Sequence, residues 1–225
     1  QHYMRRGHEV RVIAPSSKRL REQPEWLDII GDSAIVLPAS GSVANISLTY
    51  NLGPRVKRYV EREAFDVVHI HEPFQPLLPF QFVRYSKSPT VATFHAARDS
   101  GSRIYAYGRF IIQPWWPNID GRIAHSRAAL KLIGKYFPCR YRIIPSGIDY
   151  GFFAAESPPI PKFMDGKRNI LFVGRQEPRK GLPTLLEAYA KLKREMPQTR
   201  LIVVGPDGGL RPAAMRYIQQ NNVED

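Results

Sequence analysis

Short apolar runs separated by polar, helix-compatible stretches recur along the whole chain. The runs lie in the segments FDVVHIHEP, TVATFHA, GRIAHS, RYRIIPSG, RNILFVG and TRLIVVGP, and most are nearly unbroken in Val, Ile, Leu and Phe. Unbroken runs of this kind are typical of strands buried on both faces, and such strands are usually parallel. Alternation of strand and helix therefore predicts an α/β fold with doubly wound parallel sheets.

Two helices carry the clearest periodicity. One begins at Leu182, and its apolar face is formed by Leu182, Leu185, Leu186, Tyr189 and Leu192. The other is predicted over Gly53 to Glu63, where Val56, Tyr59 and Val60 share the face that we expect to pack on a sheet. Three arginines, Arg55, Arg58 and Arg62, share another face of the second helix.

A proline-rich break divides the chain. The stretch from Ala155 to Lys167 holds Pro158, Pro159 and Pro161, and it predicts a stiff interdomain linker. We therefore assign residues 1–155 to a first Rossmann-like domain and residues 156–225 to the linker and the start of a second. The opening residues run into Gly7, a helix-stop residue, and then into a strand over His8 to Ala14. We expect a first strand to precede this sequence and the second domain to be truncated.

Composition indicates a folded globular chain. Of the 225 residues, 43% are hydrophobic and 24% are charged. No run approaches the ~18 consecutive apolar residues of a membrane-spanning helix, so we do not expect an integral membrane protein. The single Cys139 excludes an internal disulfide and favours a reducing compartment, the cytoplasm.

The formal net charge of +13 indicates an anionic partner. Nucleic acid, a phosphate-bearing ligand and an acidic membrane surface all fit, as does a basic surface without a single partner. Residues 98–150 are the most basic third, with nine Lys and Arg against three Asp and Glu. No basic patch interleaved with aromatic residues occurs, so we do not expect a nucleic-acid partner.

The segment Asn169 to Gly205 predicts a phosphate site. It reads as strand, loop, helix and strand, and the loop RQEPRKG stands between the strand's carboxyl end and the helix's amino end. Backbone N–H groups and the helix dipole favour an anion at that place. Arg175 and Lys180 flank it, and a guanidinium with an ammonium suits a diphosphate. Solvation of a surface loop is the alternative role for these cations.

These residues also carry a family resemblance. The segments VGRQEPRKGLPTLLEAYAKL, IPSGID, RGHEVRVIAP, VKRYVEREAFDVVHIHEP and VATFHA resemble the retaining glycosyltransferases of family 4, and among them the bacterial phosphatidylinositol mannosyltransferases. The resemblance implies the GT-B fold, with two Rossmann-like domains facing across a cleft. It implies a nucleotide-sugar donor bound mainly by the second domain and an acceptor bound mainly by the first. It implies neither a metal nor another cofactor.

The resemblance also assigns roles to individual residues. Arg175 and Lys180 match the basic pair that holds the donor diphosphate, and His95 matches an active-site histidine near the transferring sugar. Ser42 matches a residue of the acceptor-side loop. Asn45 and Ser40 depart from the family pattern, because Asn45 stands where the inositol-lipid enzymes have an arginine for the acceptor phosphate. An inositol phosphate acceptor is therefore in doubt, and another lipid-linked or soluble acceptor stays open.

Two further groups of residues bear on ligand binding: a pair of histidines on one strand and the cations of one helix. We expect His69 and His71 to face opposite sides of the sheet and not to share a metal ion. The predicted helix over Gly53 to Glu63 resembles the membrane contact of the mannosyltransferases, and its cations are expected to face an anionic membrane unless they only solvate an outer helix. These cations are Arg55, Lys57, Arg58 and Arg62.

The sequence thus predicts a hexosyltransferase, in the resemblance a mannosyltransferase, that moves a sugar with retention to a hydroxyl acceptor. A lipid-linked acceptor would place the enzyme peripherally on the inner face of the cell membrane.

The alternative is a non-catalytic basic module of the same fold that binds an anionic membrane. A nicotinamide-dependent enzyme is disfavoured because VGPDGG, Val204 to Gly209, lacks the G-x-G-x-x-G spacing. The family's glycine-rich loop and glutamate pair are expected outside these 225 residues, so we expect the chain alone to be inactive.

Overall fold

The structure is a computed structural model that describes residues 2–16, 22–31, 34–39, 42–47, 49–75 and 77–224. For residues 34–39, 42–47, 103 and 104 it describes the backbone alone. The chain forms two compact units, residues 1–148 and residues 149–225.

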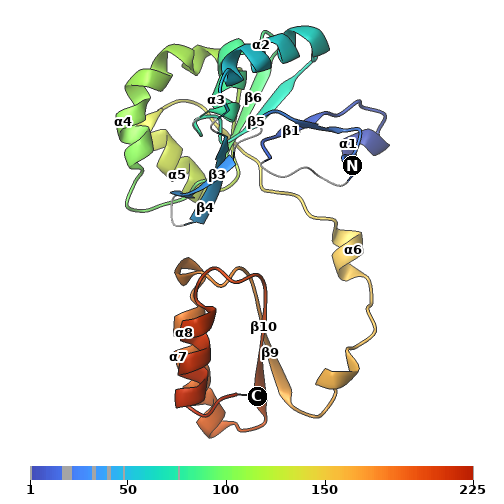
Figure 1. The fold of residues 1–225 in the computed structure, drawn as a ribbon, viewed down its shortest axis with the longest axis vertical. Helices are drawn as coiled ribbons and strands as arrows, with labels where there is room; N and C mark the ends of the chain where they lie inside the picture. Colours follow the sequence, from blue (N-terminus) through green and yellow to red (C-terminus); the bar gives the residue numbers. More distant parts are fainter. Residues whose placement is uncertain are drawn as a thin grey trace. The chain divides into compact units, whose positions relative to one another are not determined.

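The first unit begins with short elements (Figure 1). These are helix α1 (His2–Arg5), the parallel strands β1 (Val12–Ala14) and β2 (Leu27–Ile29), the antiparallel strands β3 (Ala34–Ala39) and β4 (Ser42–Ser47), and helix α2 (Leu52–Glu63). Gly7 follows α1 with a φ of 85°, a left-handed conformation that glycine adopts without strain. The predicted helix stop is confirmed.

A parallel sheet forms the centre of the first unit. Its strands follow one another in chain order: β5 (Val68–His71), β6 (Thr90–Phe94), β7 (Gly121–Ala124) and β8 (Arg142–Ile143). The connecting helices are α3 (Leu78–Tyr85), α4 (Arg103–Ile112), the 3-10 helix η1 (Gln113–Asn118) and α5 (Arg127–Tyr136). Strand–helix alternation of this kind confirms the predicted α/β fold class.

Helix α2 packs as its periodicity predicts. Val56 is 0% exposed, and Leu52, Tyr59 and Val60 are buried beside it. They join one hydrophobic cluster with residues of α3 and of strands β5 and β6. The helix ends at Ala64, which has a φ of 47° and donates its N–H to the Val60 carbonyl. The apolar face of α2 therefore packs in the hydrophobic core.

The second unit is smaller. Its elements are α6 (Tyr150–Ala154), the 3-10 helix η2 (Pro161–Phe163), β9 (Arg168–Val173), the 3-10 helix η3 (Pro178–Lys180), α7 (Leu182–Glu195), β10 (Thr199–Val204) and α8 (Arg211–Gln220). Strands β9 and β10 pair in parallel from Arg168 with Thr199 to Val173 with Val204. Helices α7 and α8 pack together beside these strands (Figure 1).

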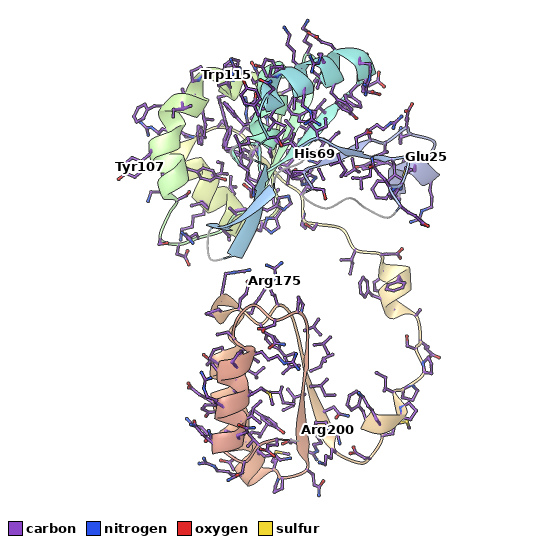
Figure 2. The ribbon with its side chains drawn as sticks, viewed as in Figure 1. Glu25, His69, Tyr107, Trp115, Arg175 and Arg200 are labelled. Carbon is purple, nitrogen blue, oxygen red and sulfur yellow. The ribbon has the colours of Figure 1, made fainter. Side chains whose placement is uncertain are left out.

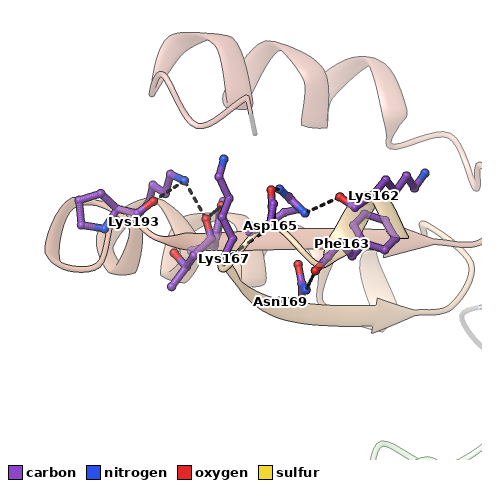
Figure 3. A network of polar contacts seen from close by, with 10 residues as sticks. Lys162, Phe163, Asp165, Lys167, Asn169 and Lys193 are labelled. Atoms are coloured by element: carbon purple, nitrogen blue, oxygen red, sulfur yellow. Dashed lines mark hydrogen bonds and ion pairs between the residues drawn. The ribbon is translucent and has the colours of Figure 1, made fainter. Parts of the chain in front are cut away.

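Within the second unit, polar contacts hold the end of the predicted linker against strands β9 and β10 (Figure 3). Asn169 donates its side-chain N–H to the Phe163 carbonyl at 3.1 Å. Arg200 of β10 forms a hydrogen-bonded ion pair with Asp165, which lowers the pKa of that carboxyl. The residues just before β9 are thus held against the start of both strands.

Strand burial differs from the expectation in two places. Strand β5 alternates, with Val68 and Ile70 buried and His69 and His71 exposed. Strand β9 leaves Leu171 62% exposed. The expectation that these strands are buried on both faces is wrong, because within the described residues only one face of each is packed against the core. In the part of the chain that the structure describes, no helix is both long and apolar enough to cross a membrane.

Candidate active site

The carboxyl ends of β5, β6 and β7 form the first candidate site. These strands are parallel neighbours, so their carboxyl ends lie at one edge of the sheet, where α/β proteins bind ligands. His71 ends β5, His95 follows β6 and His125 follows β7. The fold therefore brings the predicted His95 together with two further histidines from neighbouring strands.

Glu72 fixes the backbone at His95. Its Oε1 accepts hydrogen bonds from the backbone N–H groups of His95 and Ala96, each at 2.6 Å. Its Oε2 accepts a hydrogen bond from the Tyr105 hydroxyl at 3.0 Å. The φ of Glu72 is 51°, a left-handed conformation that is uncommon for residues other than glycine. The surrounding contacts hold the residue in this conformation, as is common at functional sites.

Tyr105 is a stable donor in this arrangement. Burial raises the pKa of its hydroxyl, and the neighbouring Glu72 carboxylate raises it further. The phenol therefore keeps its proton across the physiological range. Glu72 links the end of β5, the loop after β6 and helix α4 through one carboxylate.

His69 and His71 share one face of the sheet, and the expectation that they face opposite sides is wrong. Residues two apart on a strand point the same way. Their rings stack with centroids 4.5 Å apart, and His69 Nε2 lies 2.7 Å from the Thr93 Oγ1 atom. Figure 2 labels His69 beside the central sheet of the first unit. Among the residues that the structure describes, no three His, Cys, Asp or Glu side chains meet in an arrangement that could hold a metal ion.

Electrostatics favour neutral imidazoles at this edge. Burial lowers the pKa of His95, and the neighbouring His71 and His125 lower it further, against an opposite effect of Glu72. Burial also lowers the pKa of His69, with smaller effects of His71 and His95. A neutral imidazole has one N–H donor and one nitrogen acceptor, so His95 is suited to hydrogen bonding at neutral pH.

The second candidate site lies at the carboxyl ends of β9 and β10. The loops after these strands touch closely, because a Cβ added at Gly205 would lie 2.0 Å from the Gly174 carbonyl oxygen. No side chain fits there, so glycine is required. Gln176 and Asp207 form an isolated parallel bridge just beyond the strands, and Asp207 accepts a hydrogen bond from the backbone N–H of Arg211 at the start of α8.

Glu177 orients the predicted Arg175. The side chain of Glu177 is 9% exposed, and its Oε1 accepts a hydrogen bond from Arg175 Nη1 at 3.1 Å. Arg179 Nη2 lies 3.5 Å from the Glu177 Oε2 atom. The side chain of Arg175 is 43% exposed. A buried carboxylate thus holds one end of a guanidinium whose remaining N–H groups are accessible to an anion.

Lys180 stands between Arg175 and the start of α7. It ends the 3-10 helix η3, and the αL residue Gly181, with a φ of 78°, leads into α7. Its aliphatic stem folds back toward the end of β9, since a Cβ at Gly174 would lie 4.0 Å from Lys180 Cδ. The first backbone N–H groups of an α-helix have no partner within the helix, so they favour an anion beside these two cations.

The basic side of α2 forms a third feature. An open hollow of about 390 Å³ is lined by Ile30, Arg55, Arg58, Tyr59 and Arg62. Arg62 donates through Nε to Glu63 at 2.7 Å. Lys57 and Arg58 are exposed, as is Arg62. The membrane role of these four cations stays a prediction.

The acceptor-side residue has no described side chain. Ser42 lies in β4, where its backbone pairs with Ala39, and the side chains of Ser42 and Asn45 lie outside the described part of the structure. Ser40 is also outside the described residues. The role of Ser42 stays a prediction.

Sequence reasoning missed the two glutamates that position the predicted residues. Glu72 belongs to the segment HIHEP and Glu177 to the loop RQEPRKG, and each directly precedes a proline. Glu72 directly follows β5, whereas Glu177 lies in the loop between β9 and η3. A carboxylate before a proline in the segment that follows a strand was the available signal. Its hydrogen-bond partners, however, depend on the fold: Glu72 contacts residues 23 to 33 positions away.

Comparison with known proteins follows the same division of the chain. Residues 1–152 match the family model described as Glycosyltransferase Family 4, and residues 154–225 match the model described as Glycosyl transferases group 1. Among solved structures, a Listeria monocytogenes protein described as a UDP-N-acetylglucosamine 2-epimerase covers 80% of this chain and 52% of its own at 15% identity, with a TM-score of 0.48. Likeness at that level adds nothing to the assignment.

Curated relatives extend the match. The phosphatidyl-myo-inositol mannosyltransferase of Mycolicibacterium smegmatis is 34% identical over 88% of this chain and 51% of its own length. That of Mycobacterium tuberculosis H37Rv is 33% identical over 89% and 52%. The alpha-monoglucosyldiacylglycerol synthase of Streptococcus pneumoniae is 21% identical over 98% and 53%. The chain spans about half the length of these relatives.

The matching family model covers more than half of the chain and includes the whole histidine edge of the first unit. The second model covers the loop that carries Arg175 and Lys180. The chain therefore belongs to glycosyltransferase family 4.

Proposed function

We propose that this protein acts as a retaining glycosyltransferase that moves a hexose such as mannose from a nucleoside diphosphate sugar to a hydroxyl group of a membrane lipid. The observation that carries the proposal is the arrangement at the end of β9. Arg175 is held by the buried Glu177, next to Lys180 and the amino end of α7. A fork-shaped cation and a point charge beside the positive end of a helix dipole together match the charge of a diphosphate.

The proposed residues have distinct roles. Arg175 and Lys180 bind the donor diphosphate and stabilise the negative charge that grows on it as the sugar leaves. His95 assists by a hydrogen bond to the transferring sugar and forms no covalent bond with it. Its lowered pKa supports this role, because a neutral ring has both a donor and an acceptor nitrogen. Two cations already oppose the diphosphate charge, so we propose that transfer needs no metal or other cofactor.

A lipid acceptor is supported by two observations. The names of the relatives from Mycolicibacterium smegmatis and Streptococcus pneumoniae refer to phosphatidyl-myo-inositol and to a glucosyldiacylglycerol. Helix α2 buries its apolar face and leaves Arg55, Lys57, Arg58 and Arg62 away from the core. We propose that these cations contact the anionic inner face of the cell membrane.

Calorimetric titration tests the donor site. Pyrophosphate, UDP and GDP are titrated into the chain and into Lys180→Ala. A hydrogen bond to a charged group contributes about 1.5–3 kcal/mol, so we expect each affinity to fall roughly 10- to 100-fold. Lys191→Ala, which changes an exposed lysine of the neighbouring helix α7, is the matched control and should bind as the parent does. Equal affinities for the parent and Lys180→Ala would overturn the diphosphate site.

Product analysis tests the reaction class in the intact enzyme. Transfer from GDP-mannose or UDP-glucose to lipid extracts should give a product with the anomeric configuration of the donor, as read by NMR coupling constants. An inverted product would contradict retention. Transfer that disappears with EDTA and returns with Mg²⁺ would contradict a metal-free mechanism.

Vesicle sedimentation tests the membrane contact. Replacing Arg55, Lys57 and Arg58 by Ser removes three cations, each worth about 1 kcal/mol near an anionic surface, so partitioning should fall by roughly a hundredfold. A matched variant replaces three exposed cations of α5, Arg127, Lys131 and Lys135, and should partition as the parent does. Unchanged binding of the α2 variant would reject the contact. Vesicle binding without any diphosphate binding would favour the non-catalytic basic module.

A further inference from the structure

Four of the six histidines of the chain form one row across the sheet edge. Ring centroids lie 4.5 Å apart between His69 and His71, 5.1 Å between His71 and His95, and 5.2 Å between His95 and His125. The row crosses from β5 over β6 to β7. It therefore joins residues that are more than 50 positions apart in the sequence.

One direct hydrogen bond joins two rings of this row. His71 Nδ1 lies 2.8 Å from His95 Nε2. Two ring nitrogens at this distance need one proton between them, so one nitrogen donates and the other accepts. Whichever donates, the position of the proton on His95 is coupled to that on His71. The bond therefore couples the tautomer of His95 to that of His71.

The backbone of His95 is already fixed by another group. Glu72 accepts from the N–H groups of His95 and Ala96, which leaves only side-chain rotation and the tautomer of His95 undetermined. Three titratable side chains face this ring: His71 of β5, Glu72 after β5, and His125 after β7. Of these, His71 makes the hydrogen bond to the ring of His95.

We propose that His71 is a positioning residue for His95. Its Nδ1 atom keeps the His95 ring in one tautomer and one orientation at the carboxyl end of β6. The inference rests on the proposed function, in which His95 forms a hydrogen bond to the transferring sugar. A ring with its proton on the wrong nitrogen, or turned about its side-chain bonds, would offer that sugar no correctly placed donor or acceptor.

Imidazole nitrogen NMR of the 225-residue chain tests the bond directly. With ¹⁵N-labelled histidine at pH 7.5, His95 should show a single tautomer in the parent. His71→Phe keeps a stacking ring but removes both nitrogens, and it should give His95 a mixture of tautomers. His71→Asn places an amide nitrogen near the position of Nδ1 and should restore one tautomer. The control His69→Phe changes the neighbouring ring of the row and should leave His95 as in the parent.

Steady-state kinetics of the intact enzyme test the consequence. Because a neutral hydrogen bond is lost, His71→Phe should lower kcat roughly 2- to 10-fold with KM for the donor unchanged. His71→Asn should recover most of this loss. A merely structural role would change the unfolding midpoint instead and would not be rescued by Asn.

The outcomes separate this inference from the proposed function. If His95→Ala transfers sugar at the parent rate, the role of His95 in the reaction is wrong, while the NMR test of the His71–His95 bond still stands. If His95→Ala is impaired but His71→Phe keeps one His95 tautomer and the parent kcat, the inference about His71 is overturned. A tautomer mixture at His95 in the parent would overturn it as well.

Discussion

The two candidate sites are built in opposite ways. At the β6 end, His95 is held by Glu72 and His71, which lie 23 and 24 positions earlier, and through Glu72 by Tyr105 of α4. At the β9 end, Arg175 is held by Glu177, two positions later. The first site depends on strands and a helix packed together, whereas the second depends on the conformation of one loop.

The two sites therefore differ in how tightly they restrain their functional side chains and in how exposed those side chains are. The histidine edge restrains both the backbone and the ring of one residue, as expected for a group that must place a single hydrogen-bonding atom. The cations at the β9 end are about half exposed and have local partners. A delocalised diphosphate charge tolerates such freedom, because several donor positions satisfy its oxygens. Glu72 holds the histidine edge and Glu177 holds the donor loop. Replacing each glutamate therefore measures how strongly the two sites differ in restraint.

Glu72→Ala is expected to have the largest effect. Alanine at the same backbone angle removes three hydrogen bonds to one carboxylate, so the unfolding free energy of the first unit should fall by on the order of 3 kcal/mol. Urea unfolding with hydrogen exchange of peptides from β6 and α4 measures it. Glu72→Gln keeps an acceptor oxygen for the backbone N–H groups and should lose less. A loss below about 1 kcal/mol would show that the carboxylate does not hold this edge.

Glu177→Ala should cost less in the same experiment. Its partners Arg175 and Arg179 have side chains 43% and 47% exposed, so water replaces the lost contacts, and a loss of about 1 kcal/mol is expected. Exchange in peptides covering β9 and α7 reports the second unit by itself. A loss as large as that of Glu72→Ala would break the contrast between the two sites.

Acid should lower the stability of the first unit only, and by less than either glutamate substitution does. All six histidines lie between residues 2 and 125, and the second unit has none. The pKa values of His69 and His95 are lowered from the ordinary value of 6.5 in the folded chain, so the unfolded chain binds more protons as the pH falls. Their contribution to stability is therefore present above pH 6.5 and is lost as the pH falls through the folded values. Hydrogen exchange, corrected for the pH dependence of the intrinsic exchange rate, should become faster in β5 and β6 as the pH falls from 7 to 5, but not in β9. His69→Gln should make this increase smaller. Equal acid sensitivity of both units would contradict the assignment.

The chain's local patterns predicted most of the elements. The face of α2 with Val56 and Tyr59 packs as expected, and α7 begins at Leu182 where its periodicity begins. Each of the six apolar runs contains a strand, although β8 is only Arg142–Ile143. The antiparallel pair β3 and β4 was not predicted, because its segments include Pro38 and several small polar residues, which weaken the alternation typical of strands.

The sequence by itself determined the donor loop and left the histidine edge to the tertiary structure. Arg175, Glu177 and Lys180 are neighbours in the chain, so a strand followed by a helix is enough to bring them together. His71, His95 and His125 are separated by whole helices and meet only because β5, β6 and β7 pair in parallel with a definite register. Register is a property of packed strands, and a single sequence does not state it. For the same physical reason, the shared face of His69 and His71, the bond of the Glu72 carboxylate to the His95 backbone and the bond between two rings became visible only in the folded chain.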